Sequence, residues 1–97
     1  MIRFYDDGHL MIDPVRLRAY LDNSEVNIEF MSWKILLYLM YFCPEPADLR
    51  ELEYVTHEGD GAVQTYICRL RKEIGKEYIY QANRKEGYYF YRQDKIQ

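Results

Sequence analysis

Cysteine is scarce in this chain of 97 residues, and so are the other marks of a secreted or membrane protein. Cys43 and Cys68 are too few for a disulfide framework, and we expect them to be reduced thiols. The N-terminus lacks the pattern of a signal peptide. The longest apolar run, residues 35–43, is too short to span a bilayer. The sequence therefore predicts a cytoplasmic domain that makes no membrane contact.

Motifs that carry catalysis or metal binding are also missing. No Gly-rich phosphate loop, no Gly-x-Ser-x-Gly elbow and no paired carboxylates stand out in the sequence. The two histidines and two cysteines match no spacing used for zinc. We therefore expect a protein that is not an enzyme and that holds no cofactor or metal ion.

The bulk composition is that of one small globular domain. Hydrophobic residues make up 48% of the chain and charged residues 30%, which is unlike a disordered segment. No internal repeat, low-complexity tract or Gly/Ser linker divides the chain. We therefore expect a single domain over residues 1–97 with one hydrophobic core.

Charge is divided unevenly along the chain. Residues 1–58 hold 5 Lys and Arg against 11 Asp and Glu, whereas residues 59–97 hold 8 against 5. An acidic half followed by a basic half points toward a polyanionic partner for the C-terminal half. Small imbalances of this kind are also common on solvated surfaces, so the split alone carries little weight.

The first 29 residues carry strand and turn signals. Within residues 15–21, the apolar Val15, Leu17, Ala19 and Leu21 alternate with Arg and Tyr, which is the pattern of a half-buried strand. Two turn signals, Asp-Asp-Gly and Asp-Asn-Ser-Glu, separate further strand-like segments. We expect a four-stranded antiparallel sheet over residues 1–29, with strands near residues 2–5, 9–12, 15–21 and 26–28.

Two helices are predicted next. Residues 30–42 are too long and too continuously apolar for a strand, so we expect a buried central helix that ends before Pro44. Asp48 and Glu51 have the spacing of a capping box, which places the start of a second helix at Asp48. Two glycines make residues 57–61 a loop after that helix.

A third helix and a hairpin complete the predicted fold. The helix covers residues 62–74, with Asp60 as N-cap and Gly75 as the left-handed residue after its end. Aromatic-rich segments flank residues 83–87, which predicts a two-stranded hairpin. The layout is a winged helix-turn-helix of the α+β class, with a sheet at residues 1–29, three helices at 30–75 and a wing hairpin at 76–92.

The predicted third helix has two different faces. At 100° per residue, four aliphatic residues fall within about 60° of one another and should face the core: Val63, Ile67, Leu70 and Ile74. The opposite face gathers Thr65, Cys68, Arg69 and Lys72. Such a face suits the major groove of DNA, because Arg grips guanine or phosphate and Lys neutralises phosphate. A solvated helix face with two cations is the plainer interpretation.

The hairpin adds two cations at its predicted tip, Arg84 and Lys85. A cationic tip beside a groove-reading helix can lie along the DNA backbone or in the minor groove. Such a tip also serves solubility alone, and the pair Tyr88 and Tyr89 fits either a stacking platform for single strands or ordinary hairpin packing. The helix face and the tip together favour nucleic-acid binding more than either does singly.

Three motifs resemble the OmpR/PhoB-type winged-helix effector domain of response regulators, and together they cover essentially the whole chain. The recognition helix of that family is similar to VQTYICRLRKEI, through Val63, Ile67, Leu70, Arg71 and Ile74. Its wing is similar to RKEGYYF, through Arg84, Gly87, Tyr88 and Phe90. Its first helix is similar to VNIEFMSWKILLYL, through Val26, Ile28, Ile35, Leu36 and Leu39. The Thr and Glu of the family's first capping box are replaced here by Glu29 and Ser32.

The resemblance implies sequence-specific binding of double-stranded DNA by a transcription regulator of a two-component system. The recognition helix at residues 62–74 would lie in the major groove and the wing at residues 83–87 in the minor groove. The resemblance also implies that the loop at residues 57–61 can contact RNA polymerase and that protomers pair as a homodimer on direct-repeat sites. The DNA-binding residues would be Thr65, Cys68, Arg69, Lys72, Arg84 and Lys85.

The acidic first half of the chain motivates a second hypothesis. A protein-interaction module could keep the winged fold with weak or no affinity for DNA, and a partner would then dock on the sheet or on the Tyr-rich hairpin. Binding to random duplex DNA over a salt titration distinguishes the two hypotheses.

Overall fold

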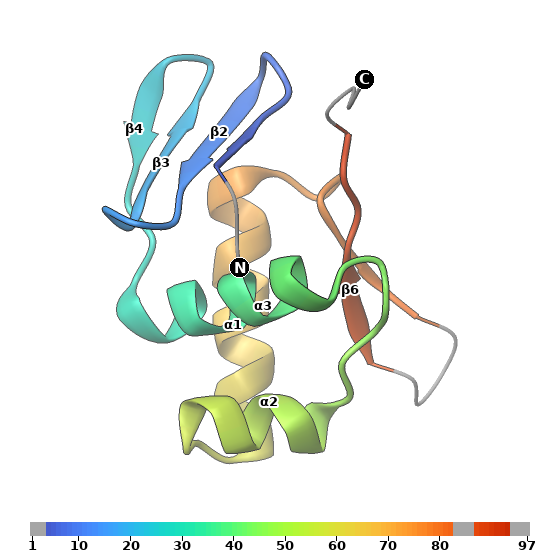
Figure 1. The fold of residues 1–97 in the computed structure, drawn as a ribbon. Coiled ribbons are helices and arrows are strands. Elements are labelled where there is room, and N and C mark those ends of the chain that lie inside the picture. The colour runs from blue at the N-terminus through green and yellow to red at the C-terminus, as the bar shows by residue number, and fades with distance from the viewer. Residues whose placement is uncertain (1–3, 83–86, 94–97) are drawn as a thin grey trace.

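The structure, a computed structural model, describes residues 4–82 and 87–93 of the chain (Figure 1). Its elements follow the predicted order of a four-stranded sheet, three helices and a two-stranded hairpin. They are β1 (Tyr5–Asp6), β2 (Leu10–Asp13), β3 (Arg18–Leu21), β4 (Ser24–Val26), α1 (Phe30–Phe42), α2 (Leu49–Thr56), α3 (Asp60–Ile74), β5 (Ile79–Gln81) and β6 (Tyr88–Phe90). The predicted winged helix-turn-helix fold is therefore confirmed.

The first sheet is antiparallel throughout, with the strand order β1-β2-β3-β4. Its last turn is tighter than the sequence predicted. Asp22 and Asn23 alone form it, with φ angles of 50° and 69°, because Asp and Asn tolerate left-handed backbone. Ser24 already pairs with Leu21, so β4 begins two residues before the predicted strand at residues 26–28.

The predicted strand at residues 15–21 is wrong in its first half, because β3 begins only at Arg18. The Asp13 carboxylate accepts the backbone N–H of Val15 at 3.0 Å, and this local turn prevails over the alternating pattern. As a result Val15 is 85% exposed, and Leu17 lies in the turn with a φ angle of 54°. From Arg18 onward, the alternating pattern predicted correctly which side of the strand faces the core.

Helix α1 has the predicted bounds and lies across the middle of the molecule (Figure 1). It contacts α2, α3 and β6, which explains its high apolar content. Trp33, Leu36, Leu37 and Met40 share one helical stripe, and all of them are buried except Leu37, which is half-buried. The helix is not buried on every side, however, because the side chains of Phe30 and Tyr41 near its two ends are exposed.

The start of α2 is fixed by the capping box that the sequence predicted. The backbone N–H of Glu51 donates to Asp48 Oδ1 at 2.9 Å, and the backbone N–H of Asp48 donates to Glu51 Oε1 at 3.2 Å. Immediately before this box, Ala47 and Tyr88 exchange two backbone hydrogen bonds of 2.8 and 2.9 Å. The beginning of α2 is therefore joined to the base of the hairpin.

One carboxylate joins the first sheet to the segment that enters the hairpin. Asp7, in the turn between β1 and β2, accepts the hydroxyl protons of Tyr5 and Tyr78 on one oxygen. Its other oxygen accepts the backbone N–H groups of His9 and Leu10. Burial alone would raise the pKa of Asp7, but these hydrogen bonds outweigh burial and hold the pKa below its ordinary value of 3.8.

Replacing Asp7 with Asn should lower the free energy of unfolding by about 1–2 kcal/mol at neutral pH, because two hydroxyls lose a charged acceptor. The folded-state pKa is lowered, so the ionised carboxylate stabilises the fold fully above about pH 4 and this stabilisation is lost as pH falls through the folded pKa. The difference in unfolding free energy between D7N and wild type, measured in urea, should therefore be full at pH 7 and smaller at pH 3.

The control for this measurement is D6N. Asp6 is exposed and accepts the backbone N–H of Gly8 at 2.9 Å, a bond that an Asn oxygen can also accept. We expect its unfolding free energy to stay within about 0.5 kcal/mol of wild type at both pH values. A D7N deficit that is equally large at pH 3 would contradict the role assigned to the ionised Asp7.

Candidate nucleic-acid interface

Helix α3 buries the aliphatic stripe that the sequence predicted. Val63, Leu70 and Ile74 are 0% exposed and Ile67 is 2% exposed. Burying one such side chain contributes about 1.5–3 kcal/mol to folding, so the four together fix the rotation of the helix about its own axis. The opposite side of α3 is consequently held outward.

The start of α3 differs from the prediction. The helix begins at Asp60, not at residue 62, and its N-cap is Gly59, not Asp60. The carbonyl of Gly59 accepts the backbone N–H of Val63 at 3.0 Å, which begins the helical hydrogen bonding at that point. Glycine is tolerated at the N-cap position. Gly59 and Gly61, which indicated a loop in the sequence, therefore do not prevent the helix from beginning at Asp60. At the other end Gly75 has a positive φ angle of 106°, as predicted, but its ψ angle of 150° places it outside the left-handed helical region.

The outward side of α3 brings together four of the six predicted site residues, which are all exposed: Thr65, Cys68, Arg69 and Lys72. The Thr65 hydroxyl donates to the carbonyl of Gly61 at 3.0 Å, so its oxygen is left to accept a hydrogen bond. Cys68 is a free and exposed thiol. Within the described part of the chain, Lys72 makes no ion pair. This side therefore offers polar groups of several kinds within one helical surface.

Arg69, in contrast, already has an anionic partner. Its Nη1 donates to the two carboxylate oxygens of Glu29 at 3.1 and 3.2 Å. Glu29 is the N-cap residue of α1 and lies 40 positions earlier in the chain. No sequence pattern connects the two residues, so the prediction of a cationic Arg69 did not include its neutralising partner.

A groove of about 400 Å³ lies beside this face, between α3 and the hairpin. Its lining holds three cations, Arg71, Lys72 and Lys76, and among the described residues no carboxylate. The remaining lining residues are Gln64, Ile67, Cys68 and Tyr88. The Nε of Arg71 is buried and has no hydrogen-bond partner among the residues that the structure describes. The exposed side of α3 thus continues into a cationic groove.

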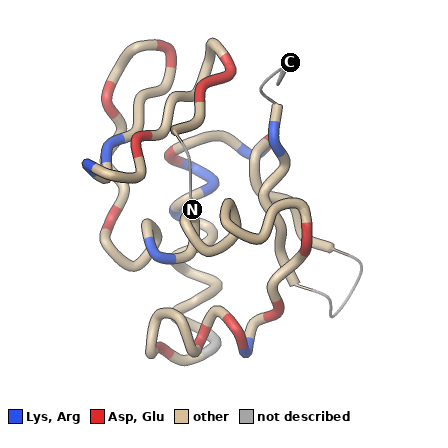
Figure 2. The backbone as a smooth tube through the Cα atoms, viewed as in Figure 1, with Lys and Arg blue, Asp and Glu red and all other residues tan. Residues whose placement is uncertain are grey.

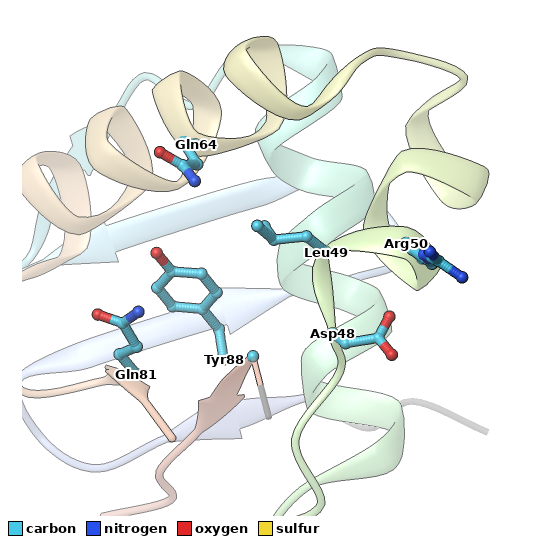
Figure 3. Close-up of a pocket in the computed structure, with 7 residues that line it drawn as sticks. Asp48, Leu49, Arg50, Gln64, Gln81 and Tyr88 are labelled. Carbon is cyan, nitrogen blue, oxygen red and sulfur yellow. The ribbon is translucent and has the colours of Figure 1, made fainter. Parts of the chain in front are cut away.

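A second hollow, of about 320 Å³, adjoins the groove, and Gln64 and Tyr88 line both. Figure 3 shows Gln64 of α3, Leu49 of α2, and Gln81 and Tyr88 of the hairpin around this hollow, with Arg50 pointing away from them. Two amides and a hydroxyl from different elements therefore meet beside the cationic groove. Lys76 and Gln81 were missed from the sequence. The place of Gln81 beside α3 depends on how the hairpin folds back, whereas Lys76 directly follows the helix.

The hairpin confirms the predicted wing only in part. Arg84 and Lys85, the two predicted wing residues, lie outside the described residues. The base of the wing is described, and there Gly87 is buried with a φ angle of 96°. A Cβ at this position would overlap the carbonyl oxygen of Ala47. The backbone of the wing therefore passes directly against the residue before the α2 capping box.

The two neighbouring tyrosines of β6 lie on opposite faces of the hairpin, as consecutive residues of a strand do. Tyr88 lines the groove beside α3, whereas Tyr89 stacks on Tyr80 across the strands at 5.8 Å between ring centroids. Tyr91 packs edge-on against Tyr80 at 5.7 Å. Tyr88 and Tyr89 therefore do not form a joint stacking platform, and packing explains this pair.

The acidic residues lie mainly on other parts of the fold. Figure 2 shows Asp and Glu on the four-stranded sheet, along α2 and on the segment that leads to α2. Glu73 is half-buried on α3 and lines a small hollow together with Arg69 and Glu29. The charge asymmetry of the sequence thus becomes a spatial one, because the groove between α3 and the hairpin carries cations.

Within residues 4–82 and 87–93, no group of three or more His, Cys, Asp or Glu side chains is placed to hold a metal ion. The helices of this part of the chain are all too short or too polar to cross a membrane.

Comparison with known proteins gives a consistent result at the level of structure. No family model matches the sequence, and no curated protein matches it significantly. Among solved structures, the DNA-binding domain of RstA from Klebsiella pneumoniae, in complex with the RstA box, has 26% identity and a TM-score of 0.74, covering 91% of this chain and 96% of that chain. The response regulator DrrB from Thermotoga maritima, an OmpR/PhoB homolog, has 26% identity and a TM-score of 0.81, covering 90% of this chain and 43% of that chain. The DNA-binding domain of CpxR from E. coli, at 18% identity and a TM-score of 0.74 over 91% of this chain and 95% of that chain, shares the fold.

The arrangement of sheet, three helices and hairpin makes this chain a winged-helix domain. Within that class its structure is similar to DNA-binding domains of OmpR/PhoB-type response regulators, which agrees with the resemblance of its three motifs.

Proposed function

We propose that this domain binds double-stranded DNA as part of a transcription regulator. Helix α3 enters the major groove with Thr65, Cys68, Arg69 and Lys72 toward the bases and backbone, and the wing lies over the adjacent minor groove. The diameter of an α-helix with its side chains, about 10–12 Å, matches the width of a major groove, about 12 Å. Support comes from the solved RstA domain, which carries the same fold and is in complex with its own DNA box.

The observation that carries this proposal is the continuous surface formed by the exposed side of α3 and the groove beside it. Arg71, Lys72 and Lys76 line that groove, and an anionic backbone is the polymer that such a row of cations attracts. Thr65 and Arg69 lie on the side of the helix that would face the base edges. Phosphate contacts would set the position of the domain, and the base contacts would set its sequence preference.

The proposal extends to parts that come from the resemblance alone. Arg84 and Lys85 would place cations in or beside the minor groove. The connection around residues 57–61 would contact RNA polymerase, and two protomers would pair on direct-repeat sites. The acidic sheet and α2 would stay clear of the duplex, because carboxylates beside phosphates are repelled.

Binding to random duplex DNA should be strongly salt-dependent. Neutralising about three to four phosphates predicts a slope of about −3 when the logarithm of the binding constant is plotted against that of the salt concentration. Fluorescence anisotropy over a salt series, followed by selection of bound sites from a random duplex library, tests this. Undetectable binding at low salt would instead support a protein-interaction module, whose partner docks on the acidic sheet or the Tyr-rich hairpin.

Two variants separate positioning from base reading within the same measurement. K72A should weaken binding to all duplexes and make the slope shallower by about 1, whereas R69A should also reduce the preference for the selected sites. R16A removes one cation at a turn of the four-stranded sheet and serves as the matched control. Unchanged affinity and preference in R69A would show that the assignment of the groove face is wrong.

A further inference from the structure

The N-cap residue of α1 directs its side chain to another helix. Glu29 has the extended backbone of an N-cap, and its carbonyl accepts the backbone N–H of Trp33 at 3.0 Å. Its carboxylate makes no hydrogen bond to the start of α1 in the described structure, although side-chain oxygens at N-caps commonly do. Both carboxylate oxygens instead accept from Arg69 Nη1, on the outward side of α3.

This pairing leaves Arg69 restrained and still accessible. The Arg69 side chain is 59% exposed and that of Glu29 is 40% exposed. Nη1 is engaged, whereas Nη2 and Nε make no hydrogen bond with the residues that the structure describes. A guanidinium has five N–H donors in a fixed planar arrangement, so a bond at one nitrogen orients the donors on the other two.

A hydrogen bond from a buried side chain joins the two helices that carry this pair. Ser32, in the first turn of α1, donates its hydroxyl proton to the carbonyl of Tyr66 on α3 at 3.1 Å and is itself buried. This bond holds the start of α1 against the middle of α3. Glu29 and Arg69 face each other over the hollow that this junction leaves, which has a volume of about 130 Å³ and is lined by Asn27, Ile28, Glu29, Ser32, Arg69, Leu70 and Glu73.

We propose that Glu29 determines the sequence discrimination of the DNA interface by neutralising and orienting Arg69. The inference rests on the proposed DNA binding. A neutral ion pair adds little to the general attraction toward phosphates, which depends on net charge. A guanidinium held in one orientation still forms directional hydrogen bonds to a base edge. Glu29 thus reduces binding that ignores sequence and favours binding that depends on it.

Removal of the Glu29 carboxylate should therefore raise affinity for random duplexes while weakening discrimination. For E29A we expect the random-duplex binding constant at low salt to rise by roughly threefold, and the salt slope to become steeper by about 0.9, because Arg69 gains a phosphate. The ratio of affinities for a selected site and a random duplex should fall by about fivefold or more. E29Q, which keeps one acceptor oxygen, should show the same change in slope and a smaller fall in this ratio.

Two controls make the outcome specific to this pair. E25A removes a carboxylate from an exposed ion pair with Arg18, at 3.8 Å in the four-stranded sheet, and should leave the affinity ratio unchanged. In an R69Q background, E29A should no longer alter the ratio, because the residue through which Glu29 acts is neutral. Urea unfolding of every variant confirms that the domain remains folded.

The results distinguish this inference from the proposed function. An unchanged ratio in both E29A and E29Q would overturn the role of Glu29, and so would a parallel rise in affinity for selected and random duplexes. In either case wild-type binding to DNA would still stand. Absence of salt-sensitive duplex binding by the wild-type domain would overturn the proposed function itself.

Discussion

Replacing Gly87 with Ala should lower the free energy of unfolding by about 3 kcal/mol or more, which is a large share of the stability of a small domain. The backbone there has a φ angle of 96°, which disfavours any residue with a Cβ. The new Cβ would also overlap the carbonyl oxygen of Ala47 and lie 2.6 Å from the Cα of Asp48. Neither neighbour can turn aside, because both obstacles are backbone.

The same change should damage the interface. Tyr88 follows Gly87, bonds to Ala47 through the backbone and lines the groove beside α3. A displaced wing base would therefore move one wall of that groove. Thermal unfolding should show a fall in melting temperature of more than about 10 °C.

Gly8 provides the matched control for this prediction. Its φ angle of 88° is similar, but an added Cβ would meet nothing within 4 Å. G8A should therefore lower the free energy of unfolding by only about 1 kcal/mol, the cost of placing an alanine at a positive φ angle. If G87A and G8A lost the same free energy of unfolding, the close approach of the wing to Ala47 would not contribute to the effect of G87A.

Alkylation of Cys68 with a bulky maleimide should reduce affinity for a selected DNA site to the level of non-specific binding, a loss of about a thousandfold or more. Cys68 is exposed on the side of α3 that we place in the major groove, and it lines the cationic groove. A large adduct there would hold the helix away from the base edges. Anisotropy titrations of modified and unmodified protein measure the loss.

The second cysteine is protected from this reagent by the fold. Cys43 is half-buried, and its Sγ donates to the carbonyl of Phe90 at 3.0 Å, so modification should occur first at Cys68. The variant C68S should have the same affinity for DNA before and after this treatment. A bound duplex should also slow the modification of Cys68. Full affinity of the Cys68-modified protein would contradict the docking of α3 in the major groove.

The elements that local patterns specify were predictable. The capping box of Asp48 and Glu51 sets the start of α2 because its two hydrogen bonds join residues three positions apart. The buried stripe of α3 was predictable because a helix repeats every 3.6 residues, which fixes the side that faces the core. The exposed positions of Cys68 and Lys72 follow from that stripe.

Other local patterns competed with each other, and the outcome was predicted wrongly. Alternation favoured a strand at residues 15–21, but the hydrogen bond from Val15 to the Asp13 side chain forms a turn there. Two glycines favoured a loop before α3, yet Gly59 serves as its N-cap. In both cases local hydrogen bonds at the end of an element shifted the boundary.

The sequence by itself determined the class of fold, the buried side of α3 and, through that side, which residues point outward. Only the tertiary structure decided which charged groups pair with the outward residues and which elements form the groove beside them. The partner of Arg69 is Glu29, 40 positions away, and Tyr88 reaches the groove only because the chain folds back as a hairpin. The physical reason is that helical periodicity acts over a few residues, whereas the charge around a side chain depends on every element packed beside it.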